Sequence, residues 1–221
     1  LRIFSLANNR ITNCLIENGF WREIRDTHLV HPDMATPVLF LDRDGTIIDH
    51  VHYIRDPGDV KLCAHAAEFI KAANRANIPT ILVTNQSAIG RGYFGWECFL
   101  AVQDRMDELL YAEGCHLSAV YACSDVPEKD GHPPSMYRKP QPGMLLKGAS
   151  DFNAALARSW MIGDNSTDIQ AGVAANVGNA CLVSSGLGKA EAQKAQSLEI
   201  SDTFFRCGQS LADVRGLIPE M

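Results

Sequence analysis

Short apolar runs alternate with helical patterns along most of the 221-residue chain. The apolar runs occupy residues 37–41, 79–83, 117–122, the segment that starts at Ser159, 179–183 and 203–205. Runs of this length are typical of buried strands, because a helix needs a longer apolar stripe. Between them, residues 64–76 are rich in alanine, and apolar side chains recur at helical spacing from Phe99 to Leu110. This alternation predicts an α/β fold built on a doubly wound parallel sheet.

Acidic residues follow two of the predicted strands directly. Asp42 and Asp44 come after the first apolar run, and Asp164 follows the run that starts at Ser159. Parallel strands end at a common edge of the sheet, which is where open α/β sheets bind their ligands. Neighbouring carboxylates attract a divalent cation, and one of them could attack phosphorus while the other transfers a proton. The alternative is a polar turn in which the acids serve only the turn geometry.

Hydroxyl and amide groups follow the second predicted strand, at Thr84, Asn85 and Ser87. Because a glycine-rich turn comes next, these groups could bind phosphate oxygens. The same residue types also cap ordinary helices, so the signal is open to both interpretations. Tyr53 lies in the loop that leaves the first strand and could face a polar substrate, although ordinary surface polarity explains such a residue better.

Two further candidates are charged residues in the second half of the chain. Lys139 stands in a proline-rich turn beside Arg138, where it offers a fixed positive charge for carboxylate or phosphate oxygens. The alternative is an exposed basic pair beside prolines. Asp168 lies four residues after Asp164. It could orient a metal ligand or a lysine without binding the metal itself. Alternatively, Asp168 could favour the N-terminus of the helix that begins there.

The net charge and the cysteine content indicate which partners and which cellular compartment to expect. The formal net charge is −6 and no dense lysine or arginine run occurs, so we expect no nucleic-acid partner. Seven scattered cysteines without a CxxC pair indicate a reducing, cytoplasmic compartment. No stretch reaches the length of a membrane span, so we expect no membrane partner. We also expect a monomer.

The first 36 residues differ from the rest of the chain and are interpreted as an N-terminal extension and linker. The domain proper would then comprise residues 37–221, about the size of one typical domain. Residues 19–24 carry a tryptophan and alternating polarity, so this segment could dock on the domain as a short strand. A loosely ordered extension is an equally good interpretation.

Four short motifs occur in order along the predicted domain. They are Asp42-Arg43-Asp44-Gly45-Thr46, Thr84-Asn85-Gln86-Ser87, Arg138-Lys139-Pro140 and Gly163-Asp164-Asn165-Ser166-Thr167-Asp168. Together they resemble the four motifs of the haloacid dehalogenase (HAD) superfamily. Within it, the chain looks like the heptose-bisphosphate and histidinol-phosphate phosphatase group. The motif spacing leaves no room for a large cap, so the resemblance implies a capless or minimally capped phosphatase that acts on a small phosphorylated substrate.

The resemblance also implies a role for each motif residue. Asp42 would be the nucleophile that forms an aspartyl-phosphate, and Asp44 the general acid and then the general base. Mg²⁺ would bind the Asp42 carboxylate, the Asp44 backbone carbonyl and Asp164. Thr84 and Lys139 would hold the phosphoryl oxygens, with Arg138 recognising the substrate. The carboxylate attack is physically coherent, because metal and lysine cancel its repulsion with the phosphate.

Two departures from the group's pattern limit what the resemblance implies. The heptose-bisphosphate group usually has a zinc loop of Cys-x-His and Cys-x-Cys. Here Cys123 takes the first position, and the other three are Asp125, Ser135 and Tyr137, so we expect a zinc-free loop. Asn165 stands where that group often has lysine, which leaves the exact substrate open. A non-catalytic phospho-ligand binding module is the rival from another class, but a binder needs no acid–base residue at Asp44.

Overall fold

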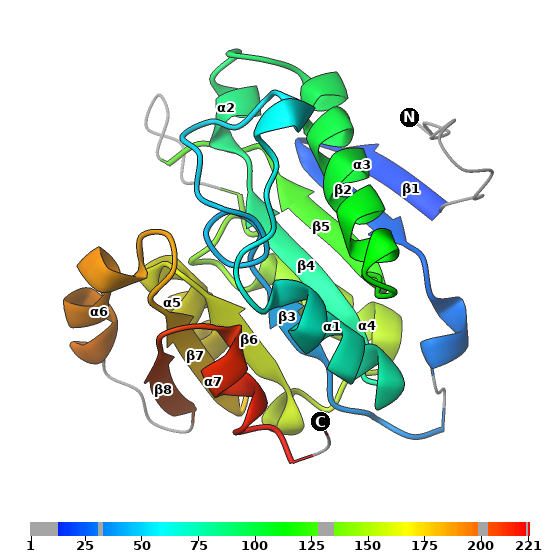
Figure 1. Ribbon diagram of the computed structural model, residues 1–221, viewed down its shortest axis with the longest axis vertical. Coiled ribbons are helices and arrows are strands. Elements are labelled where there is room, and N and C mark those ends of the chain that lie inside the picture. Colours follow the sequence, from blue (N-terminus) through cyan, green and yellow to red (C-terminus); the bar gives the residue numbers. More distant parts are fainter. Residues whose placement is uncertain (1–12, 31–32, 128–134, 199–202, 220) are drawn as a thin grey trace.

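The computed structural model describes residues 13–30, 33–127, 135–198, 203–219 and 221. In this part of the chain, eight strands form one sheet in the order β1-β2-β5-β4-β3-β6-β7-β8 (Figure 1). The strands are β1 (Asn13–Glu17), β2 (Phe20–Ile24), β3 (Leu39–Leu41), β4 (Thr80–Asn85), β5 (Ala119–Cys123), β6 (Trp160–Gly163), β7 (Asn179–Val183) and β8 (Phe204–Gly208). The six strands from β5 to β8 in this order are parallel, whereas β2 pairs antiparallel with β5.

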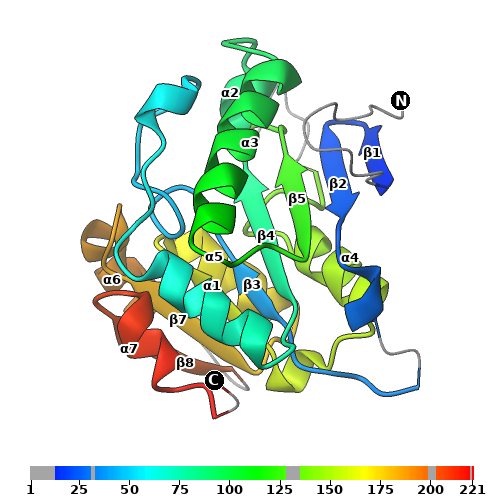
Figure 2. The ribbon, with the colours of Figure 1, turned by 45° about the vertical axis from the view of Figure 1, so that its right-hand side comes forward.

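Helices cover both faces of the sheet and make a three-layer α/β structure (Figure 2). They are α1 (Ala66–Arg75), α2 (Ser87–Gly90), α3 (Trp96–Ala112), α4 (Gly143–Phe152), α5 (Ser166–Ala174), α6 (Gly188–Gln196) and α7 (Leu211–Arg215), with 3₁₀ turns at Thr27–Leu29, Pro57–Asp59 and Leu156–Arg158. Helices α1, α3 and α7 bury their apolar sides in one core cluster. Helices α4 and α5 pack in a second cluster on the opposite face. The predicted doubly wound α/β fold is confirmed.

The strand order places the acidic residues at a topological switch point. From β3 the chain runs to β4 on one side, and β6 returns to pair with β3 on the other side. Ligands of open α/β sheets bind outside the carboxyl ends of the strands at such a point. Between β3 and β4, and between β4 and β5, the chain forms only α1, α2, α3, a 3₁₀ turn and loops, so no separate cap domain is inserted there. None of the helices that the structure describes is long and apolar enough to cross a membrane.

The N-terminal segment forms a hairpin that extends the sheet, which the strand pattern only partly anticipates. Residues 20–24 do dock as a strand, β2, but β1 is an additional element that the sequence pattern does not indicate. The turn between them is Asn18-Gly19, with φ of 48° and 78°, which is the conformation that two-residue hairpins favour. The antiparallel strands lie at one edge of the sheet, an arrangement common among otherwise parallel sheets.

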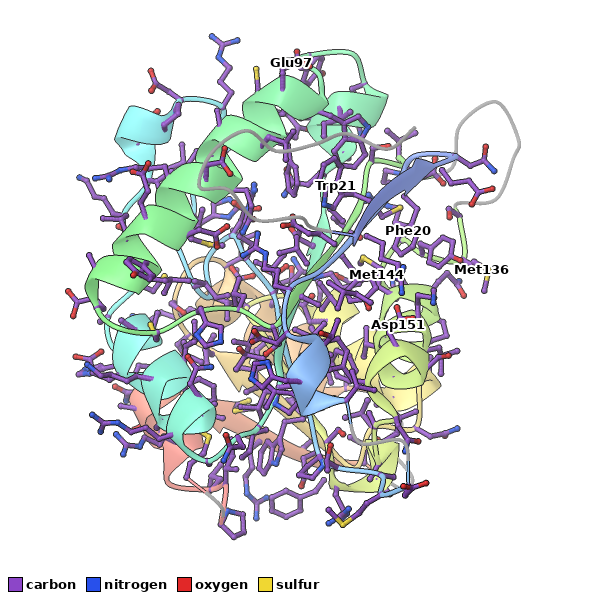
Figure 3. The ribbon with its side chains drawn as sticks, turned by 90° about the vertical axis from the view of Figure 1, so that its right-hand side faces the viewer. Phe20, Trp21, Glu97, Met136, Met144 and Asp151 are labelled. Carbon is purple, nitrogen blue, oxygen red and sulfur yellow. The ribbon has the colours of Figure 1, made fainter. Side chains whose placement is uncertain are left out.

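A polar network ties β2 to the helix beneath it. Arg22 donates to both carboxylate oxygens of Asp151 on α4, at 2.6 and 2.7 Å, and Asp151 is labelled in Figure 3. The Tyr121 hydroxyl on β5 donates to Asp151 at 2.7 Å, and Lys147 on α4 donates at 2.6 Å. Although burial opposes the shift, these donors hold the pKa of the Asp151 carboxyl below its ordinary value. One carboxylate thereby joins β2, β5 and α4.

Replacing Asp151 by alanine should therefore lower the free energy of unfolding by about 2–4 kcal/mol, because the buried Tyr121 hydroxyl and the half-buried Arg22 lose their acceptor. Urea denaturation of the parent and the variant measures the change. Glu108→Ala is the matched control, since the Glu108 side chain is 59% exposed and pairs with Arg105 on the surface of α3. That control should stay within about 0.5 kcal/mol of the parent. Equal losses in the two variants would show that the Asp151 network contributes no more than a surface pair.

Candidate active site

Asp42 and Lys139 form a buried ion pair at the carboxyl end of β3. Lys139 Nζ lies 2.6 Å from Asp42 Oδ1 and 2.6 Å from Asp168 Oδ1, and it donates to the carbonyl of Val83 at 2.8 Å. Asp42 is only 7% exposed and Lys139 only 2%. Burial raises the pKa of Asp42 well above its ordinary value, and Lys139 opposes that shift. Burial alone would lower the pKa of Lys139, but the two carboxylates raise it, so the ammonium group stays charged.

Asn85 holds the main chain of Lys139 rather than presenting a free amide. Its Nδ2 donates to the Lys139 carbonyl at 2.9 Å, and its Oδ1 accepts from the Lys139 backbone N–H at 3.0 Å. Both ends of the amide are therefore engaged by one residue. Asn85 therefore contacts the main chain of the lysine that precedes Pro140, and its binding of phosphate oxygens stays a prediction.

Three carboxylates converge beside the lysine and fit a divalent cation. Asp42, Asp164 and Asp168 each offer one oxygen within 4.8 Å of the others, and all three residues are buried. Asp168 already accepts from Lys139 through Oδ1 and from the Asn165 backbone N–H through Oδ2, at 3.0 Å. A cation would therefore be held by Asp42 and Asp164, whose oxygens are the ligand type that Mg²⁺ takes. Burial raises the pKa of Asp164 to about 7.

Asp44 is held by two residues that the sequence analysis missed as parts of the site. Arg43 Nε lies 3.2 Å from Asp44 Oδ1, and Gln86 Nε2 donates to Asp44 Oδ2 at 2.9 Å. Gln86 also donates to the Thr84 hydroxyl of its own motif at 2.9 Å, so its bond to Asp44 links the second motif to the first. Arg43 is fully buried, with its guanidinium 5.1 Å from the centre of the Phe99 ring. A charged residue between two acids after a buried strand was the signal that could have identified Arg43.

Two glycines allow the backbone to approach Asp164 closely. Gly45 and Gly186 have positive φ of 90° and 57°. A Cβ built on either residue would collide with Asp164 Oδ2, and one on Gly186 would also lie 2.7 Å from the Gly45 Cα. The neighbouring Leu187 backbone N–H donates to Asp164 Oδ2 at 2.7 Å. The carboxylate therefore lies in a cleft of backbone that admits no side chain at these two positions.

The other predicted substrate residues are Arg138, Tyr53 and Ser87, and none of the contacts described for them is with Asp42 or Asp164. Arg138 donates from Nη1 to the Asp125 carbonyl at 2.6 Å, and burial lowers its pKa, with Arg91 acting in the same direction. Tyr53 opposes the lowering of the Arg138 pKa, and its ring lies 5.2 Å from that of Tyr93. Ser87 is the first residue of α2 and is half-buried.

Hydrogen bonds and a ring stack hold the loop where a zinc site was considered. Asp125 accepts from the Val126 backbone N–H at 3.0 Å through Oδ1, and from the Ser135 backbone N–H through Oδ2. The Tyr137 ring stacks on Phe20 of β2, with ring centres 3.8 Å apart. Cys123 is buried, and burial raises the pKa of its thiol.

Comparison with known proteins agrees with this geometry. Residues 136–206 match the model of the HAD-hydrolase-like family. The chain is 42% identical to D-glycero-beta-D-manno-heptose-1,7-bisphosphate 7-phosphatase of Mesorhizobium japonicum over 172 residues, covering 76% of this chain and 78% of that protein. It is 36% identical to the enzyme of that name from Yersinia pestis over 156 residues, covering 69% and 82%.

Solved structures support the same grouping. A crystal structure described as that of a HAD-like phosphatase from Mesorhizobium loti matches with a TM-score of 0.79 and 36% identity, covering 92% of this chain and 95% of that one. The D,D-heptose 1,7-bisphosphate phosphatase of B. bronchiseptica, complexed with magnesium and phosphate, matches with a TM-score of 0.72 and 25% identity, covering 82% and 97%. Fold and relatives together define a HAD-type phosphatase, a phosphoric monoester hydrolase. The chain belongs to the heptose-bisphosphate phosphatase family of HAD-like hydrolases.

The close approach at Asp164 generates a direct test. Gly186→Ala should lower kcat for phosphate release by about 10²-fold, because the new methyl group must displace Asp164 or Gly45. The matched control is Gly92→Ala, since Gly92 also has a positive φ, 74°, but its Cβ would meet nothing within 4 Å. Both variants carry the strain of a left-handed residue, about 1–2 kcal/mol. Equal activity in the two variants would contradict a role for the tight backbone around Asp164.

Proposed function

We propose that this protein hydrolyses the 7-phosphate of D-glycero-D-manno-heptose 1,7-bisphosphate through an aspartyl-phosphate intermediate. The observation that carries the reaction is the buried contact of Lys139 with Asp42 at 2.6 Å, beside Asp164. This contact places the positive charge of Lys139 beside Asp42, the carboxylate expected to attack phosphorus. The choice of substrate rests on the relatives that are 36–42% identical and are named for that reaction.

The chemistry divides among a few side chains. In the first step, an Asp42 oxygen forms a bond to phosphorus, the bond to the leaving sugar oxygen breaks, and Asp44 gives that oxygen a proton. In the second step, water attacks phosphorus, its proton passes to Asp44, and the bond to Asp42 breaks. Lys139 and the Thr84 hydroxyl hold the phosphoryl oxygens throughout, since a carboxylate approaching a phosphate needs its repulsion offset.

We infer that Mg²⁺ is held by the Asp42 carboxylate, the Asp44 backbone carbonyl and Asp164. When bound, the ion neutralises negative charge on the phosphoryl group. Asp168 serves as a positioning residue for Lys139 and for the backbone of Asn165. We further infer that the loop around Cys123 binds no zinc, because a structural zinc site takes four nitrogen or sulfur ligands and the oxygens of Asp125 are engaged by backbone N–H groups.

Histidinol phosphate is kept as the second candidate substrate on one specific observation. Asn165 occupies the position where the heptose-bisphosphate group often has lysine. Its side-chain oxygen accepts from the Thr167 backbone N–H and hydroxyl, both at 3.0 Å. Asn165 is therefore a helix cap and adds no positive charge beside the site.

A panel of phosphorylated metabolites tests the proposed substrate by measuring phosphate release with Mg²⁺ present. The highest kcat/KM is expected for the heptose 1,7-bisphosphate, and EDTA should stop release. Asp42→Asn should reduce turnover to background while leaving the fold intact, since Asp168 still pairs with the buried Lys139. A higher kcat/KM for histidinol phosphate would reassign the substrate, and turnover of the variant within a few-fold of the parent would refute the nucleophile.

The role of Asp44 is tested separately by the pre-steady-state burst. Asp44→Asn should slow the burst with the sugar phosphate by about 10²–10⁴-fold, the usual range of general acid catalysis, because the sugar alkoxide needs a proton. The burst with p-nitrophenyl phosphate should change much less, since nitrophenolate leaves without protonation. If both bursts slow equally, Asp44 acts only on the metal or the local structure.

A further inference from the structure

The N-terminal hairpin contacts one end of the loop that carries Arg138. This loop leaves β5 at Ser124 and returns to the site through Tyr137 and Arg138. The Gly19 carbonyl in the hairpin turn accepts from the Ser124 backbone N–H at 2.8 Å and from the Ser124 hydroxyl at 3.0 Å. Gly19 has φ of 78°, and a Cβ there would lie 2.7 Å from Ser124 Oγ. The turn therefore fits against the start of the loop.

Phe20, the next residue, contacts the other end of the same loop. Its ring stacks on Tyr137 with centres 3.8 Å apart and planes 6° apart, and it is 4% exposed. Phe20 and Trp21 point to opposite faces of the sheet, with Phe20 toward the side of Met136 and Met144 (Figure 3). A well-packed ring pair contributes specific geometry beyond simple burial.

The two residues after Tyr137 differ in how they are held. Lys139 has partners outside the loop, namely Asp42, Asp168 and the Val83 carbonyl. Arg138, in contrast, is held from within the loop. Its backbone N–H donates to the Ser135 carbonyl at 2.9 Å, and its Nη1 donates to the Asp125 carbonyl at 2.6 Å. Asn85 fixes the main chain on the Lys139 side, so the place of the Arg138 guanidinium depends on the described ends of the loop, at Asp125 and Ser135.

We propose that Phe20 is a positioning residue for Arg138, and that the N-terminal hairpin thereby sets the affinity for the substrate. The inference rests on the proposed function in one respect, the recognition of substrate by Arg138. The fold itself does not depend on the stack, because β2 is also joined to β5 by backbone pairing and to α4 through Arg22 and Asp151. Phe20 acts through Tyr137 and touches no reacting atom.

Steady-state kinetics of Phe20→Leu and Tyr137→Leu test this with the full chain and Mg²⁺. Each variant should raise KM for the heptose 1,7-bisphosphate by about 2- to 10-fold, the range expected from the loss of one ring pair. The value of kcat should stay within about twofold of the parent. For p-nitrophenyl phosphate, which lacks the remote group that Arg138 would bind, KM should not change. The double variant should be no worse than either single variant, because the two rings form one contact.

Two control variants distinguish an effect on the position of Arg138 from a general loss of stability. Phe152→Leu removes a ring from the same core cluster at the far end of α4, and it should lower stability without changing KM. Tyr137→Phe keeps the stack and should behave like the parent. A rise in KM with Phe152→Leu equal to that with Phe20→Leu would overturn the proposal.

Native-state hydrogen exchange gives a readout that needs no substrate. The Arg138 and Gly143 amides donate to the Ser135 and Met136 carbonyls, both at 2.9 Å. Their exchange should accelerate in Phe20→Leu and not in Phe152→Leu. Unchanged exchange and unchanged KM in Phe20→Leu would overturn the inference. If the parent does not turn over the heptose 1,7-bisphosphate, the proposed function fails, and the exchange comparison alone decides whether Phe20 holds the loop.

Discussion

The ammonium group of Lys139 lies 2.6 Å from each of two carboxylates, those of Asp42 and Asp168, at the edge of the sheet. A charge buried in a protein is costly unless it is paired and hydrogen-bonded. Here the pairing is complete, since the Val83 carbonyl accepts from the same group and Asn85 fixes the lysine main chain. Three strand ends and the Pro140 turn must therefore meet correctly before this charge can be buried.

The charge balance around this group accounts for what the site can bind. Asp42, Asp164 and Asp168 are buried together, and Lys139 offsets only part of their negative charge. Burial consequently raises the pKa of Asp42 and brings that of Asp164 to about 7. A divalent cation bound to these oxygens would supply the missing positive charge. A phosphate could then approach a carboxylate that would otherwise repel it.

Strand β2 supports the site from both faces of the sheet, because successive side chains of a strand point in opposite directions. On one face, Trp21 packs against Phe99 with ring centres 6.1 Å apart, and Phe99 lies beneath the Arg43 guanidinium that holds Asp44. On the other face, Phe20 stacks on Tyr137, directly before Arg138 and Lys139. A segment that the sequence alone marks as an extension thus packs beneath two of the four motifs.

The sequence by itself determined the fold class, because short apolar runs that end in acids are visible in the local pattern of residues. It also determined the family, because each of the four motifs is a contiguous stretch of sequence. The same reasoning brought Asp42 and Asp164 to one sheet edge, since parallel strands end together. Only the tertiary structure decided which groups touch: that Asn85 binds the main chain of Lys139, that Gln86 and Arg43 hold Asp44, and that β1 and β2 pair with β5. Periodicity indicates which side of an element is buried, but it does not indicate which residues that side contacts. Contacts such as that of Phe20 with Tyr137 join residues far apart in the chain, so they arise only when the sheet has assembled.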